Sequence, residues 1–364
     1  MSIRMRRRKH ALPSKIVSIS CCLFVVLGCD QPEPGSVDLQ PVELWRIDDL
    51  DGRPAEPRLA DDGTVTYHDF ENHISYLYDA QGELISRFAP RGDEPGAVQF
   101  YLNAFWAGRT LVIVAPDRLF LFDDTGQFLR AYANNPFERF PLRFLDAETM
   151  LVAPAQLNQA SRDTLFVQRV DLASGASSPF AQLPITKGVS GPPGLVVLGL
   201  TPQAVVSYES QTDRYYVGEN DSPVIYVLDG QGQHQGELRL PTQRRPITLE
   251  EKAAQFADLD LPQQQISDQA SQMPDSLTCY RRFEVNHGRL WVFPSVSIER
   301  DPASVPVHIY DDSGSLLVET GLSFGEWRVA GNPDNVQVNG NRVAAILVND
   351  AGERRLAVYE ITLP

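Results

Sequence analysis

The chain has 364 residues, of which 43% are hydrophobic and 22% charged, with 27 proline and 25 glycine residues. This composition excludes collagen, a coiled coil and a wholly disordered chain. The formal charge of −15 at pH 7 argues against nonspecific binding to nucleic acid, because an acidic surface repels phosphate instead of releasing its counterions.

Residues 1–28 have the layout of an export signal. All six basic residues of this segment lie between Arg4 and Lys15, and the 13-residue apolar run 16–28 follows them. A membrane-spanning helix needs about 20 apolar residues, so this run fits the core of a signal peptide instead. Without the segment, 26 basic and 47 acidic residues remain, a formal charge of −21.

The end of the segment, Val26-Leu27-Gly28-Cys29, resembles the bacterial lipobox. The resemblance implies that Cys29 carries diacylglycerol and palmitate-type chains and becomes the mature N-terminus, which would anchor the protein to a membrane. An ordinary signal peptide that contains Cys29 by chance is the alternative. The proline-rich residues 30–41 are predicted to be a tether. In enteric bacteria an aspartate such as Asp30 resembles the signal for retention at the periplasmic face of the inner membrane.

Cysteine usage excludes an intramolecular disulfide in the mature chain. Cys21 and Cys22 leave with the signal peptide and Cys29 is lipidated, so Cys279 remains alone. We expect Cys279 to be a small buried hydrophobic residue and not a nucleophile.

The mature chain contains six copies of one pattern: an apolar run that ends in an acid, a turn, and a second apolar run. The acids of the six copies are Asp79, Asp123, Asp171, Asp229, Asp311 and Glu360. Their spacings of 44, 48, 58, 82 and 49 residues match one four-stranded propeller blade each, with one long insertion.

The chemistry of the copies supports this interpretation. Turns such as Asp-Ala-Gln-Gly place a turn-forming aspartate before a glycine that can adopt positive φ. Runs such as Leu119–Phe122 are apolar at every position, as expected for a sheet packed between two neighbours. The sequence therefore predicts an all-β fold, a six-bladed β-propeller over residues 42–364.

Ring closure is also predicted. The sixth copy ends at Pro364 where its outermost strand should begin, and Val42–Ile47 has the β-branched and aromatic content of a strand without a partner of its own. We expect residues 42–47 to complete blade six and to remove an open edge.

The body resembles the six-bladed β-propeller lipoproteins of bacteria, relatives of NHL and TolB-type propellers. The connection Arg87–Phe100 carries Gly92, Pro95, Gly96 and Phe100 at matching places, although Gln99 replaces the usual acid. The resemblance implies the fold and leaves the activity open.

The longest departure from the repeat is residues 241–278, between blades four and five. Thr248-Leu249-Glu250-Glu251 is a capping-box pattern, and it predicts a helix over about 249–259. A second short helix could follow, and we expect the insertion to cap the channel mouth.

Ligand contacts are expected at the connections between blades, which surround one mouth of the central channel. The candidates there are Arg91, Arg139, Arg244, Arg245, Arg281 and Arg282. Because the rest of the protein is acidic, these arginines would attract an anion or an acidic partner, unless they only neutralise nearby acidic side chains.

Two functions remain open. The first is a noncatalytic, membrane-anchored and monomeric binding or scaffold module for a protein or an anionic small ligand. The second is a Ca²⁺-dependent hydrolase or lyase with its site at the channel mouth, for which the oxygen ligands would come from Asn103, Asp146, Glu284 and Asn335.

No other motif assigns a catalytic residue or a cofactor. His68 to His73 holds two imidazoles and two carboxylates within six residues, but the spacing does not match a zinc helix motif, and we expect a solvated loop. There is no nucleophile elbow, phosphate loop or dinucleotide fingerprint.

Overall fold

The computed structural model describes residues 39, 41–133, 139–154, 164–184, 203–254, 262–296, 301–331 and 333–363. The chain divides into two units, 1–33 and 34–364, and all of the described residues belong to the second. The predicted signal peptide, Cys29 and most of the tether therefore lie outside the described residues. Within the described part of the chain, no helix is long and apolar enough to cross a membrane.

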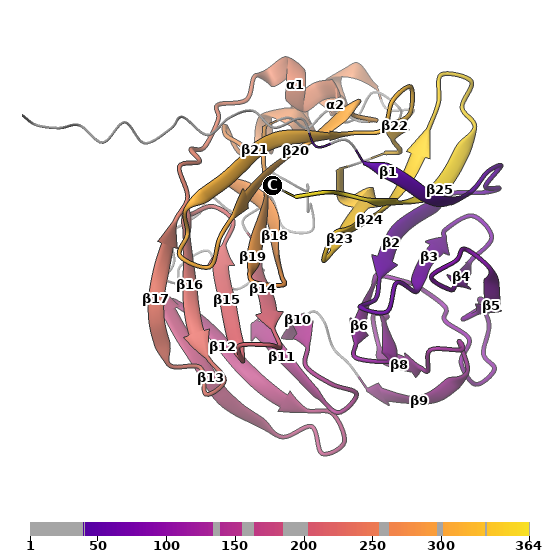
Figure 1. The fold of residues 1–364 in the computed structure, drawn as a ribbon, viewed down its shortest axis with the longest axis horizontal. Coiled ribbons are helices and arrows are strands. Elements are labelled where there is room, and N and C mark those ends of the chain that lie inside the picture. Colours follow the sequence, from indigo (N-terminus) through magenta and orange to yellow (C-terminus); the bar gives the residue numbers. More distant parts are fainter. Residues whose placement is uncertain are drawn as a thin grey trace, which may run out of the picture. The chain divides into compact units, whose positions relative to one another are not determined.

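Six antiparallel sheets surround a central axis and form a six-bladed β-propeller, as predicted (Figure 1). Blade one contains β2 (Pro54–Leu59), β3 (Val65–Asp69), β4 (Ile74–Tyr78) and β5 (Leu84–Phe88). Blade two contains β6 (Asn103–Ala107), β7 (Thr110–Val114), β8 (Arg118–Phe122) and β9 (Phe128–Ala133). Blade three contains β10 (Arg139–Phe144), β11 (Thr149–Pro154), β12 (Thr164–Asp171) and β13 (Ser177–Pro184).

The other three blades continue in chain order. Blade four contains β14 (Ala204–Glu209), β15 (Arg214–Glu219), β16 (Val224–Asp229) and β17 (His234–Arg239). Blade five contains β18 (Tyr280–Asn286), β19 (Arg289–Pro294), β20 (Ser304–Tyr310) and β21 (Leu316–Ser323). Blade six contains β22 (Arg328–Val329), β23 (Val336–Asn339), β24 (Arg342–Val348), β25 (Arg354–Glu360) and β1 (Val42–Ile47). In blade six, β22 and β23 share the innermost position, since both pair with β24.

The repeated turns form as the sequence predicts. Oδ1 of Asp79 accepts the backbone N–H groups of Gln81 and Glu83, each at 2.9 Å. The same two bonds recur at Asp123, Asp229 and Asp311. Gly82 has a φ of 86°, a conformation that a side chain would strain. The aspartate and the glycine thus fix where each outer hairpin turns.

Six hydrophobic clusters of the described residues each lie between two neighbouring blades, and a seventh lies within the insertion after β17. Leu77 of blade one and Leu111 of blade two, for example, are buried in the same cluster. Burying one leucine side chain contributes about 1.5–3 kcal/mol. Because every blade is covered on both faces, its strands are apolar at consecutive positions.

Strand β1 closes the ring. It pairs antiparallel with β25 in a register that runs from Val42 opposite Glu360 to Ile47 opposite Leu356. The Trp45 indole N–H donates to the carbonyl oxygen of Ala80 at 3.0 Å and so ties the strand to blade one. The predicted closure by residues 42–47 is confirmed.

The insertion after β17 contains two helices, α1 (Leu249–Ala254) and α2 (Gln263–Gln272). The capping box is present, because Glu251 accepts the Thr248 N–H at 2.8 Å and donates its own N–H to the Thr248 hydroxyl. Residues 255–261, over most of which the first helix was expected to continue, lie outside the described residues. Both helices lie near the periphery of the ring (Figure 1).

Candidate ligand site in the central channel

A cavity of about 580 Å³ lies at the centre of the ring, and residues from all six innermost strands line it. The strands are β2, β6, β10, β14, β18 and β23. Its size is in the range of roughly 300–1,000 Å³ that small-molecule sites occupy. The described residues of the insertion do not line this cavity, so the expected cap over the mouth is not found among them.

The lining carries more positive than negative charge. Its charged side chains are Arg53, Arg58, Arg143, Arg281 and Arg282, against Glu56, Asp61, Glu284 and Asp334. This is a net charge of +1 in a chain whose formal charge is −15. The cavity is therefore better suited to an anion than the acidic composition of the chain suggests.

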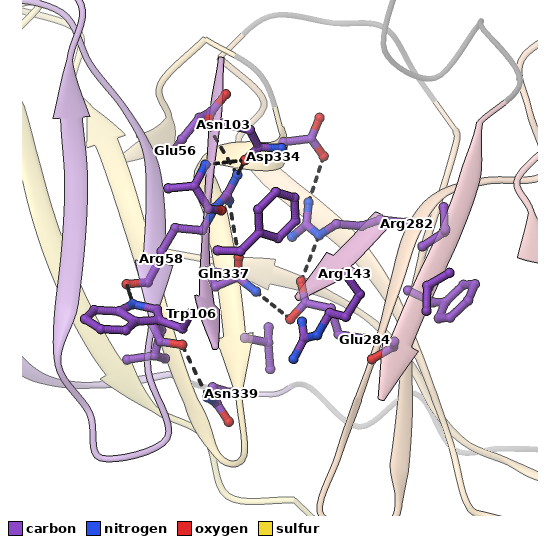
Figure 2. Close-up of a pocket in the computed structure, with 18 of the residues that line it drawn as sticks. Glu56, Arg58, Asn103, Trp106, Arg143, Arg282, Glu284, Asp334, Gln337 and Asn339 are labelled. Carbon is purple, nitrogen blue, oxygen red and sulfur yellow. Dashed lines mark hydrogen bonds and ion pairs between the residues drawn. The ribbon is translucent and has the colours of Figure 1, made fainter. Parts of the chain in front are cut away.

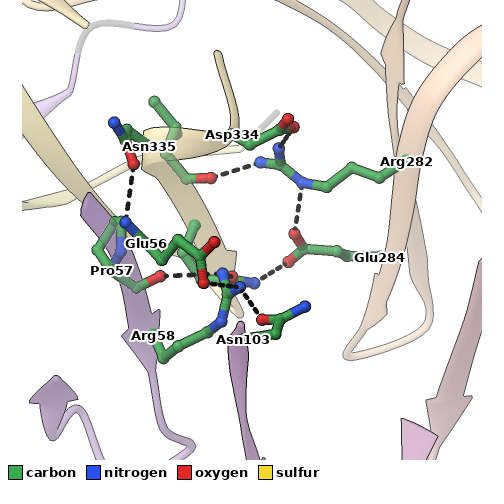
Figure 3. Close-up of polar contacts among 10 residues, drawn as sticks. Glu56, Pro57, Arg58, Asn103, Arg282, Glu284, Asp334 and Asn335 are labelled. Atoms are coloured by element: carbon green, nitrogen blue, oxygen red, sulfur yellow. Dashed lines mark hydrogen bonds and ion pairs between the residues drawn. The ribbon is translucent and has the colours of Figure 1, made fainter. Parts of the chain in front are cut away.

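Arg58 is held on several sides (Figure 3). Its Nε donates to the carbonyl oxygen of Ala104 at 2.7 Å, and a terminal nitrogen donates to Asn103 Oδ1 at 2.5 Å. The same nitrogen lies 3.3 Å from Glu56 Oε2, and the other donates to Gln337 Oε1 at 3.4 Å. Arg58 is thus a fixed part of the wall that joins blades one, two and six.

A second network joins blades five and six. Arg282 donates to Glu284 Oε1 at 3.0 Å and to Asp334 Oδ1 at 2.7 Å, and its guanidinium carbon lies 3.9 Å from the Phe293 ring centroid. The other oxygen of Glu284 accepts from Gln337 at 2.7 Å. Hydrogen bonds between charged groups are stronger than those between neutral groups. These bonds therefore hold Arg282 in place, as the first network holds Arg58.

Glu56 has a strained backbone in this wall. Its φ is 56°, unusual for a residue other than glycine, and β2 shifts register here against β3. Its N–H donates to Asn335 Oδ1 at 2.8 Å. Burial raises the pKa of Glu56, and the neighbouring charge of Asp334 adds to this, while Arg58 opposes it.

An aromatic cluster supports Glu56 from behind. The Tyr101 hydroxyl shares a hydrogen bond with Glu56, and the Tyr101 ring stacks on His68 with centroids 4.1 Å apart. Burial lowers the pKa of His68 to about 4, and its Nδ1 lies 3.0 Å from the Ser75 hydroxyl. The expectation that residues 68–73 form a solvated loop is thus wrong at its start, because His68 belongs to β3 and is buried between sheets.

Arg143 differs from Arg58 and Arg282. It points into the cavity from β10 (Figure 2), and no side-chain hydrogen bond or ion pair joins it to another described residue. Burial lowers the pKa of Arg143, and the charges of Glu284 and Asp61 oppose this shift only in part. Arg143 thus brings an incompletely compensated positive charge to the cavity.

Of the six predicted arginines, Arg281 and Arg282 line the cavity, and they lie in β18 itself, not in the connection before it. Arg139 begins β10, and its side chain lies outside the described residues. Arg91 lies on the exposed connection after blade one, 5.9 Å from the Phe100 ring centroid.

Arg244 and Arg245 have acidic partners within or next to the insertion. Arg244 bonds the buried Asp221 at 3.2 Å, and Arg245 bonds Glu251 at 2.7 Å. The structure therefore brings two of the six candidates together in the channel and places Arg91, Arg244 and Arg245 elsewhere, while the Arg139 side chain is outside the described residues. Cys279 is buried, as expected, and burial raises the pKa of its thiol to about 11.

The four predicted Ca²⁺ ligands do not all meet. Asn103, Glu284 and Asn335 line the cavity, whereas Asp146 lies in the turn after β10 and accepts the Glu148 N–H at 2.7 Å. Among the described residues, no group of three His, Cys, Asp or Glu side chains could hold a metal ion.

Glu56, Arg58 and Arg143 were not predicted as site residues from the sequence. A signal for the first two exists, because polar residues alternate along the innermost strands, as in Glu56-Pro57-Arg58 and Arg282-Phe283-Glu284. With period 2, these positions share one face of a strand, which in a propeller can face the channel.

No family model and no curated protein sequence matches the chain. It is similar in structure to a member of the DUF4221 family from Bacteroides vulgatus, with a TM-score of 0.55 and 9% identity over 90% of this chain and 99% of that chain. This likeness supports the propeller fold alone. Virginiamycin B lyase from Staphylococcus aureus has a TM-score of 0.43 and 11% identity over 88% of this chain and 99% of that chain.

Proposed function

We propose that this chain is an exported, lipid-anchored propeller that binds a small anionic organic molecule in its central channel without changing it chemically. The observation that carries the proposal is Arg143, whose guanidinium points into the cavity without a side-chain partner among the described residues. Arg143 is partly buried and its charge has no partner among the described residues, so a bound carboxylate would compensate it.

The rest of the lining supports binding over catalysis. Arg58 and Arg282 are held by contacts within the wall, and Glu284 accepts from two neighbours. The described lining includes no His, Cys or Lys side chain, so general base and nucleophile would both have to be carboxylates or hydroxyls. Ser207, the hydroxyl-bearing residue of the lining, accepts the Val285 N–H at 2.8 Å.

Export and anchoring are supported by sequence. The basic segment, the short apolar run and the lipobox-like end at Cys29 together have the order of a lipoprotein signal. A ligand-binding propeller held at a membrane would meet small molecules outside the cytoplasm.

The test is a thermal shift with succinate and with succinamide, its uncharged counterpart, at equal ionic strength. We expect succinate to raise the melting temperature of the wild type by a few degrees, since a ligand that binds only the folded state stabilises it. Succinamide should have no effect, and Arg143→Gln should abolish the succinate shift. Arg109→Gln is the matched control, because Arg109 is an exposed surface residue paired with Asp124.

Equal shifts with both compounds, or an Arg143→Gln protein that responds to succinate like the wild type, would contradict the proposal. Folding should not confound the result, because no described side chain loses a hydrogen bond or an ion pair when Arg143 is replaced.

A further inference from the structure

The end of the channel at which Arg143 lies also carries two amide oxygens that accept no hydrogen bond from a described residue. Each blade begins with its innermost strand, so the innermost strands run in the same direction along the channel. Arg143 is next to last in β10, while Asn286 ends β18 and Asn339 ends β23. All three line the cavity, and Figure 2 shows Arg143 and Asn339 away from the end that holds Glu56 and Asn103.

The orientation of the two amides follows from their partners. The Asn286 amide nitrogen donates to the carbonyl oxygen of Val338 at 3.3 Å. The Asn339 amide nitrogen donates to the carbonyl oxygen of Leu59 at 3.2 Å and to Asp61 Oδ1 at 2.9 Å. Because all three partners are acceptors, each amide must present its nitrogen to them and keep its oxygen for another group.

The two amide oxygens can only accept hydrogen bonds, and no bond to either is found among the described residues. A ligand at this end must therefore present an anionic group to Arg143 and hydrogen-bond donors to Asn286 and Asn339. Neutral hydroxyl groups meet the second demand without adding positive charge to a lining that is already net positive.

We infer that the channel ligand is a polyhydroxylated carboxylic acid, with its carboxylate on Arg143 and hydroxyl groups donating to Asn286 and Asn339. This inference rests on the proposed function and adds the class of the ligand. At the other end, the amide oxygen of Asn103 accepts from Arg58 and from the Ala104 N–H. The amide nitrogen of Asn103 therefore points away from them and has no partner among the described residues. It can donate to a hydroxyl farther along the same molecule.

Four six-carbon compounds test the need for the carboxylate and for the hydroxyl groups separately: gluconate, hexanoate, sorbitol and 6-aminohexanoate. Gluconate has both the carboxylate and the hydroxyls, hexanoate lacks the hydroxyls, and sorbitol lacks the carboxylate. In calorimetric titrations of the wild type we expect gluconate to bind at least tenfold more tightly than each of the other three. A lost hydrogen bond that leaves a polar group unpaired weakens binding by this order.

Two variants assign the contacts. Arg143→Gln should bring the affinity for gluconate down to that for sorbitol. Asn286→Ala should lower the affinity for gluconate several-fold and leave that for hexanoate unchanged. Glu94→Gln, in the exposed connection after blade one, is the control and should bind all four compounds like the wild type.

The outcomes separate this inference from the proposed function. If hexanoate binds as tightly as gluconate and still depends on Arg143, the channel binds anions but the hydroxyl contacts are wrong. If 6-aminohexanoate binds most tightly, the donor is an ammonium group, which also overturns the inference. If no acid binds in a way that depends on Arg143, both proposals fail.

Discussion

The buried Asp221 is the side chain that ties the insertion to blade four. Its carboxylate is fully buried and lies 3.1 Å from Arg244 Nε, at the start of the insertion. Burial raises the pKa of Asp221, and Arg244 opposes this shift. The folded state thus tolerates this charge because Arg244 compensates it.

We predict that Arg244→Ala lowers the free energy of unfolding by about 2 kcal/mol, since it leaves a buried carboxylate without its partner. Asp221→Asn should cost less, and the double variant should recover much of the loss. Urea denaturation measures all three. A double variant as unstable as Arg244→Ala would show that the charge of Asp221 is not the cause.

His68 should make the stability of the protein depend on pH. Burial lowers the pKa of His68 to about 4, whereas an unfolded histidine titrates near 6.5. Between these values the unfolded chain binds the proton and the folded chain does not. The contribution of neutral His68 to the free energy of unfolding is therefore fully present above pH 6.5 and is lost as the pH falls toward 4.

We predict that this loss is on the order of 3 kcal/mol between pH 6.5 and pH 4. His68→Gln should flatten that part of the stability curve, as measured by urea denaturation at several pH values. His234→Gln, at an exposed position, should keep the wild-type slope. Parallel curves for His68→Gln and the wild type would refute the assignment.

Strand β1 is short, but it closes the ring by pairing with β25. Its side chains are mostly exposed, but it covers the free edge of β25 and carries Trp45, which packs against blade one. Without β1, blade six would lose its outermost strand, and the contact between the first and last blades would weaken.

A chain that begins at Gly52 should therefore lose cooperative unfolding, whereas a chain that begins at Gln40 should keep it. Thermal unfolding followed by circular dichroism distinguishes the two. Identical melting curves would mean that the ring closes without β1.

The repeats were predictable because their signals are local. In four blades the aspartate and glycine of the outer turn lie three residues apart, and the all-apolar strands before them reveal burial on both faces. The missing sixth hairpin even predicted β1. The channel was not predictable in the same way, because Glu56, Arg143 and Glu284 meet only through the ring, across connections of different lengths. Arg281 and Arg282 were found by their charge, but were placed in a connection instead of a strand.

As a whole, the molecule joins a closed ring to a predicted membrane anchor. The proposed ligand contacts, Asn103, Arg143, Asn286 and Asn339, lie on four of the innermost strands, so the cavity needs no ordering of loops before it binds. The proposed anchor depends on Cys29 alone, because two or more acyl chains on one residue are enough for stable attachment.

We predict that metabolic labelling with a palmitate analogue marks the wild type in the membrane fraction and does not mark Cys29→Ser. The ring should fold equally well in both, because Cys29 lies outside it. Label on the variant, or an unlabelled and freely soluble wild type, would contradict the anchor.

The central claim is that the channel binds an organic acid through Arg143. Its most direct test is to purify the wild type and Arg143→Gln from the producing membrane, denature both, and identify the small molecules released by mass spectrometry. We expect an acid to be released in near-equimolar amount from the wild type and to be lost from Arg143→Gln. Equal release from both proteins, a bound molecule without an acidic group, or no acid from the wild type would contradict it.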